Sequence, residues 1–277
     1  MIRTPLIWIV VGGLGACIPA IAIDENVPDA QPPWAAPAAT LPDFGRTAWH
    51  ATKYVASSPT EWDSDDWLKL GGATALIVGT GLLLDEPLRD AARRNHGNGF
   101  SRFARDVEPL GYEYSVGVLG AFYVTGVATH NPRAKLVAED GLIASALSGG
   151  ATLLIKEMVG RSRPSSGQGA DHFTPFRGRA SFPSSHATQA FTVASVIAAH
   201  YGDDPWIDAA VYGVATMVCV ARVDRDEHFA SDVLAGALIG HVIGRAVVNS
   251  RLSSAEHVRW TPMAAPGFAG LVVEVDF

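Results

Sequence analysis

The stretch "GLIASALSGGATLLIK", residues 141–156, decides the fold of this chain. It is apolar almost throughout, it is rich in Gly, Ala and Ser, and it shows no alternation of apolar and polar residues. Alternation with period two would indicate a strand, whereas a long apolar run with small residues is typical of a helix that packs closely against other helices. We therefore expect a helix over about 136–158.

Five further apolar segments have the same character and are bounded by polar residues, Pro or Gly. Capping residues precede several of them, as in Asn131-Pro132 and Asp204-Pro205. The sequence thus predicts an all-α protein, a six-helix up-down bundle within a domain over 61–250. In the tail, 251–277, two short alternating runs around Pro266-Gly267 predict a small β-hairpin. The five segments are 67–84, 113–129, 186–201, 205–221 and 231–249.

The N-terminus has the layout of a secretory signal peptide over residues 1–22. A basic residue, Arg3, precedes a short apolar stretch, and Ala20-Ile21-Ala22 offers a cleavage site. An uncleaved anchor and a lipoprotein modified at Cys17 are the alternatives. Residues 23–60 are then a Pro/Ala-rich linker and lead-in. We expect an exported protein that is periplasmic or lies in a membrane facing the periplasm.

The composition does not decide whether the bundle lies in water or in a membrane. Mean hydropathy is +0.17, high for a soluble protein and low for a polytopic membrane protein. At the end of the bundle where the first, third and fifth segments begin, the junctions show no consistent Lys/Arg excess, which favours a periplasmic bundle. The small-residue content favours the membrane. The formal net charge of -7 argues against a nucleic-acid partner, so any bound anion must meet a local cluster of cations.

Three short clusters carry residues suited to chemistry. "KEMVGRSRP" begins at Lys156, "PSSH" ends at His186, and "ARVDRDEHFASD" ends at Asp232. Taken singly, each has an ordinary explanation, because Lys suits a helix end and Ser or Asp suits a helix start. In an up-down bundle, however, all three clusters lie at the same end. Cations, helix N-termini and two His side chains then form an anion site with groups for acid–base and nucleophilic work.

The three clusters, in this order, resemble the signature of the type 2 phosphatidic acid phosphatase superfamily. The matching pattern is Lys-x6-Arg-Pro from Lys156, Pro-Ser-x-His from Pro183, and Arg-x5-His-x3-Asp from Arg222, over a region of about 60–250. The superfamily includes lipid phosphatases, bacterial class A acid phosphatases and vanadium haloperoxidases. Two positions depart from its usual pattern, because Ser185 replaces Gly and Ala221 replaces Ser.

The resemblance implies a metal-independent phosphatase without a cofactor. His228 would attack phosphorus and form a phosphohistidine, Asp232 would orient it, and His186 would protonate the leaving oxygen and later activate water. The phosphoryl oxygens would be bound by Lys156, Arg163, Ser184, Ser185 and Arg222.

The substrate stays open at this point. A phosphorylated lipid and a small soluble phosphoester both fit, and the loop 167–180, with His172, is placed to influence the choice. Two other functions remain as alternatives. A vanadium-dependent haloperoxidase would use the same residues to hold vanadate, and an exported anion-binding protein would use them without catalysis.

Overall fold

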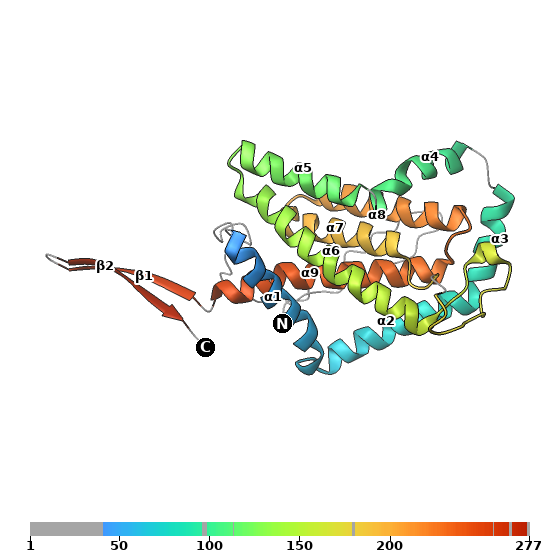
Figure 1. The fold of residues 1–277 in the computed structure, drawn as a ribbon, viewed down its shortest axis with the longest axis horizontal. Coiled ribbons are helices and arrows are strands. Elements are labelled where there is room, and N and C mark those ends of the chain that lie inside the picture. The colour runs from blue at the N-terminus through green and yellow to red at the C-terminus, as the bar shows by residue number, and fades with distance from the viewer. Residues whose placement is uncertain are drawn as a thin grey trace, which may run out of the picture. The chain divides into compact units, whose positions relative to one another are not determined.

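The computed structural model describes residues 41–95, 99–112, 114–178, 181–256, 258–265 and 268–275. The predicted signal peptide, Cys17 and the first part of the predicted linker lie outside these residues. Each of the six predicted segments is a helix in the structure, as Figure 1 shows. These helices are α2 (Ser64–Leu83), α5 (Ser115–Ala128), α6 (Pro132–Val159), α7 (Ser185–Tyr201), α8 (Pro205–Asp224) and α9 (Ala230–Glu256).

Further helices add to these six. The helical part of the fold class is therefore confirmed, whereas the six-helix count is not. One added helix, α1, lies in the stretch predicted as a linker, and its Ala51 is fully buried in the main hydrophobic cluster. The domain boundaries themselves stay a prediction. The added elements are α1 (Leu41–Ser57), α3 (Asp85–Asn95), α4 (Gly99–Val107) and the short 3-10 helices η2 (Ser58–Thr60), η3 (Glu108–Gly111) and η4 (Pro164–Ser166).

The starts of the helices follow from local capping. Asn131 Oδ1 accepts a hydrogen bond from Ala134 N at the start of α6, and Asp204 Oδ1 accepts one from Trp206 N at the start of α8. Ser184 Oγ accepts one from Ala187 N and so caps α7. Each cap satisfies a backbone N–H group that has no partner within its own helix.

Consecutive long helices run in opposite directions, and α7 packs against α6, α8 and α9 (Figure 1). The contact between α7 and α9 depends on three glycines spaced four residues apart on α9. A Cβ atom at Gly236 would lie 2.5 Å from Ser184 O, and one at Gly240 would lie 2.2 Å from Thr188 O. At Gly244 it would lie 2.9 Å from Ser195 Cβ. Only glycine allows the two helices to approach this closely.

The outer surface of the bundle is unusually apolar. Large side chains on α2, α5 and α6 are exposed, among them Leu82 (80% exposed), Val124 (65%) and Leu154 (69%). By length and composition, α6, α8 and α9 could each cross a membrane, and the bent pair of α2 and α3 could add a fourth span. Of the three, α9 is mostly buried, while α6 and α8 leave most of their residues outside the core. These features favour the membrane alternative over the periplasmic bundle.

After α9, the strands β1 (Val258–Ala265) and β2 (Phe268–Val275) pair antiparallel, with Val258 opposite Val275 and Ala265 opposite Phe268. They are described by their backbone alone. The predicted C-terminal hairpin therefore stays a prediction as a part of the fold.

Candidate active site

The three sequence clusters meet at one end of the bundle, where α6 and α8 end and α7 and α9 begin (Figure 1). Ser184 N donates to Asp232 O over 3.0 Å and joins the second cluster to the third. Ser165 N donates to Asp226 O over 3.0 Å and joins the loop after the first cluster to the third. Lys156, buried near the end of α6, interacts electrostatically with Asp232, Arg163 and Arg222.

His228 and Asp232 form the predicted pair. His228 Nδ1 lies 3.7 Å from Asp232 Oδ2, and both side chains are almost completely buried. The carboxylate of Asp232 is fixed by other donors, with Ser181 Oγ at 2.6 Å and Phe229 N at 2.9 Å from Oδ2. A small movement of the imidazole would convert the 3.7 Å approach into a hydrogen bond at Nδ1. Nε2 would then carry the lone pair.

Burial lowers the pKa of His228 to about 4, although the neighbouring Asp232 carboxylate acts in the opposite direction. Removing a charged imidazolium from water costs more free energy here than its partner returns. The ring is therefore neutral near pH 7. A neutral imidazole is the form that can act as a nucleophile.

Arg161 lies within the first cluster and is a site residue that was not predicted. Its Nη1 donates to Asp232 Oδ1 and its Nη2 donates to Asp85 Oδ2, both over 2.7 Å. The guanidinium also lies 4.3 Å from the centre of the Phe229 ring. Asp85, at the start of α3, in turn accepts from Ser231 N and Ser231 Oγ. The sequence signal for this residue is a second arginine inside the first cluster. If such an arginine is buried, it requires anionic partners, which here are Asp232 and Asp85.

His186 lies in the first turn of α7, half-buried, with its ring 5.5 Å from that of Tyr112. Gly111 allows η3 to approach α8 closely, because a Cβ atom at this position would lie 2.4 Å from Val218 Cγ1. Ser185 is the first residue of α7, and its φ is not among the positive values of the described residues. The conformation at this position therefore does not require the Gly of the usual pattern.

The two predicted phosphate-binding arginines are ion-paired. Arg222 is buried and pairs with Glu108, which also binds Arg225. Arg163 is more exposed and pairs with Glu227. Neither glutamate was predicted as a site residue. Glu108 lies in a polar stretch without a recognisable motif, and Glu227 occupies one of the unspecified positions before His228.

The loop after the first cluster folds back over Arg161. Ala170 O accepts from Arg161 Nε over 2.8 Å, and Ser162 Oγ lies 2.8 Å from His172 Nδ1. His172 is thus held by Ser162, beside the first cluster. Within the described part of the chain, no group of three or more His, Cys, Asp or Glu side chains has the arrangement of a metal site. Independence of metal stays a prediction.

Comparison with known proteins finds the same superfamily that the three motifs indicated. Residues 141–254, which contain all three clusters, match the family model of the PAP2 superfamily. The recognition of this superfamily from the sequence is therefore confirmed for this region.

Among curated proteins, the chain is similar to a lipid A 1-phosphatase of Porphyromonas gingivalis, with 36% identity over 111 residues. The match covers 40% of this chain and 22% of that protein, so the chain spans about a fifth of its relative's length.

Two solved structures are also similar. One is the crystal structure of Aquifex aeolicus LpxE, with a TM-score of 0.46, 21% identity, and coverage of 60% of this chain and 95% of that one. The other is the first transmembrane PAP2 type phosphatidylglycerolphosphate phosphatase from Bacillus subtilis. Its TM-score is 0.47, with 19% identity and coverage of 73% of this chain and 93% of that one.

Proposed function

We propose that this protein is a membrane-embedded phosphatase that hydrolyses a lipid phosphate through a phosphohistidine at His228. The observation that carries the proposal is the buried pair of His228 and Asp232, in electrostatic contact with Lys156 and Arg222. A neutral imidazole beside fixed cations is suited to attack a phosphoryl group, because the negative charge on its oxygens needs prearranged positive partners.

In the first step, His228 Nε2 attacks phosphorus while the bond from phosphorus to the leaving oxygen breaks. Asp232 stabilises the positive charge that develops on the ring, through Nδ1–H. His186, at the N-terminus of α7, gives its proton to the leaving oxygen. In the second step, His186 takes a proton from water, the water oxygen attacks phosphorus, and the P–N bond breaks to release inorganic phosphate.

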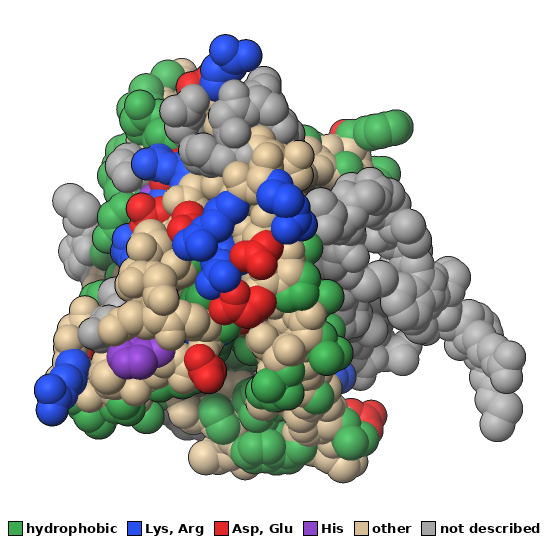
Figure 2. Space-filling model, turned by 90° about the vertical axis from the view of Figure 1, so that its right-hand side faces the viewer, with side chains coloured by type: hydrophobic (Ala, Val, Ile, Leu, Met, Phe, Trp, Pro, Cys, Tyr) green, Lys and Arg blue, Asp and Glu red, His purple; other side chains and the backbone are tan. Residues whose placement is uncertain are grey.

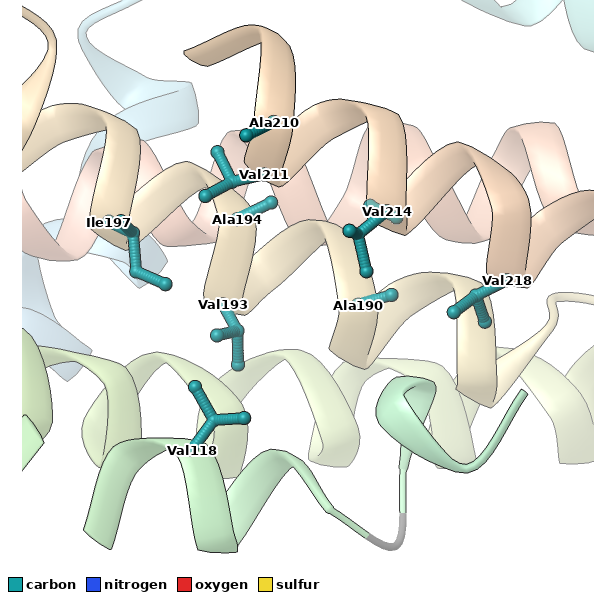
Figure 3. A pocket seen from close by; sticks show the side chains of 10 residues that line it. Val118, Ala190, Val193, Ala194, Ile197, Ala210, Val211, Val214 and Val218 are labelled. Carbon is teal, nitrogen blue, oxygen red and sulfur yellow. The ribbon is translucent and has the colours of Figure 1, made fainter. Parts of the chain in front are cut away.

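A lipid substrate is supported by the apolar surroundings of the site. A hollow of about 230 Å³ is lined by Val, Ala and Ile side chains from α7 and α8, with Val118 from α5. Figure 3 shows these side chains. Ala190 lies one helical turn after His186, and Val218 lies one turn before Arg222. The hollow therefore begins beside the site and could receive an acyl chain. The curated relative named above is a lipid A 1-phosphatase, which favours hydrolysis of a lipid phosphate over the haloperoxidase and the non-enzymatic alternatives.

The test is phosphate release by the purified full chain, from a long-chain lipid phosphate in detergent micelles and from a small chromogenic ester. We expect turnover of the lipid, loss of activity in H228A at unchanged thermal stability, and an acid-labile phosphoryl label on the wild-type protein after rapid quenching. Full activity in H228A would overturn the nucleophile. Efficient turnover of the small ester alone would overturn the lipid substrate.

A further inference from the structure

The cations of the site are interleaved with acidic side chains. Figure 2 shows this end of the molecule, where Lys and Arg side chains lie directly beside Asp and Glu. Glu227 Oε2 pairs with Arg163 Nη1 and also lies 3.5 Å from Arg222 Nη2. One carboxylate oxygen thus lies between an arginine of the first cluster and an arginine of the third. This is the arrangement that a phosphoryl oxygen requires of two arginines.

The two glutamates of the site differ in how firmly they are held. The Glu108 side chain is 7% exposed and pairs with buried Arg222, so breaking that pair would leave a buried charge without compensation. The Glu227 side chain is 27% exposed, and its partner Arg163 is 43% exposed. An ion pair with this exposure contributes little free energy and can open readily.

The loop that carries Glu227 is held in place by its neighbour. Arg93 binds both carboxylate oxygens of Asp226, at 3.1 Å from Nε and 2.6 Å from Nη2, and Arg93 Nη2 also donates to Pro164 O. Asp226 adopts a positive φ of 59° within this clasp. The loop therefore has an anchor that does not depend on the charge of Glu227.

We propose that Glu227 is a resident competitor for the phosphoryl group. In the ligand-free site its carboxylate bridges Arg163 and Arg222, and an incoming phosphoryl group takes its place on these arginines. After hydrolysis, the return of Glu227 assists the departure of inorganic phosphate. Glu227 thereby sets the affinity of the site for phosphate and the strength of product inhibition. The inference rests on the proposed phosphatase function.

The test measures binding of inorganic phosphate to the full chain by calorimetry, and inhibition by phosphate in the lipid phosphatase assay. In E227Q, which removes the charge and keeps the shape, we expect both constants to tighten by roughly three- to tenfold. The gain should shrink in R163Q/E227Q, because part of it acts through Arg163. D203N is the matched control. It removes a carboxylate from a half-buried arginine, Arg133, at the other end of the bundle and should change neither constant.

The direction of the change in phosphate affinity distinguishes a competitor role of Glu227 from a structural one. If Glu227 only held Arg163 in place, E227Q would bind phosphate more weakly, and weaker or unchanged binding overturns the proposal. E227A should act in the same direction as E227Q, so a folding defect in one variant does not remove the test. Failure of the proposed function would appear differently, as a wild-type protein without turnover. An active wild-type enzyme whose phosphate inhibition is unchanged in E227Q would refute the role of Glu227 alone.

Discussion

Arg161 donates a hydrogen bond of 2.7 Å to Asp232, the residue that faces the imidazole of His228. The same guanidinium binds Asp85, so a single buried cation holds a carboxylate from α9 and one from α3. The orientation of His228, the proposed nucleophile, thus depends on a residue from the first cluster. Arg161 is a positioning residue, since it acts on the reaction through Asp232.

Replacing Arg161 by Ala should lower kcat by about 100-fold or more and also lower the melting temperature, because two buried carboxylates lose their partner. R161K should recover part of the stability and little of the kcat, since an ammonium cannot reproduce the two-sided geometry of the guanidinium. Steady-state kinetics and thermal unfolding in detergent give both quantities. R133A, which removes an arginine far from the site, serves as the control. A normal kcat in R161A would contradict the positioning role.

The low pKa of His228 predicts its behaviour with pH. Its ordinary pKa is 6.5, and burial lowers it to about 4, so the ring should stay neutral from pH 8 down to about pH 5. Below that range the ring binds a proton, and the nucleophile is lost. The stability that goes with the neutral buried ring is complete above pH 6.5 and falls as the pH drops toward 4. NMR of 15N-histidine-labelled protein, assigned by comparison with H228N, measures this pKa. Titration of the His228 signal near 6.5 would contradict the effect of burial.

Close packing of α7 on α9 predicts sensitivity at Gly240. In G240A the new Cβ atom would meet Thr188 O, a backbone atom of α7, at 2.2 Å and force the helices apart. We expect a loss of about 1–3 kcal/mol in unfolding free energy. G213A is the matched control, because a Cβ atom at Gly213 on α8 would meet nothing within 4 Å. That variant should be as stable as the wild type or slightly more stable. Equal melting temperatures of the two variants would show that the helices do not pack through Gly240.

Whether the bundle is surrounded by lipid or by water can be tested at Leu142. This residue lies in the middle part of α6, and its side chain is 43% exposed. Arg at such a position costs about 2.5–3.5 kcal/mol in a membrane and almost nothing on a wetted surface. We expect L142R to lower the amount of protein in the carbonate-washed membrane fraction, and L142A to leave it unchanged. If L142R accumulated and folded normally without detergent, the proposed membrane location would be wrong.

The sequence predicted those parts of the fold that depend on local patterns. Apolar segments and capping residues gave six of the helices, and the alternation of their directions predicted that Lys156, His186 and Asp232 would share one end. Glu108 and Asp85 were missed for a physical reason. Each is an acidic residue in a polar stretch, and each becomes a site residue only through a partner that is far away in the sequence. Glu108 binds Arg222 and Asp85 binds Arg161, and neither pairing has a local signal.

Each of these two pairings joins the region that matches the PAP2 family model to an element before it in the chain. Residues 141–254 contain the proposed nucleophile, its carboxylate partner and the proposed phosphate-binding cations, but the carboxylates of Asp85 and Glu108 lie outside that region. An isolated fragment of α6 to α9 would keep every proposed reacting group, but Arg161 and Arg222 would lack these counter-ions. The helices before residue 141 therefore supply the negative charges that neutralise two buried arginines of the proposed reaction centre.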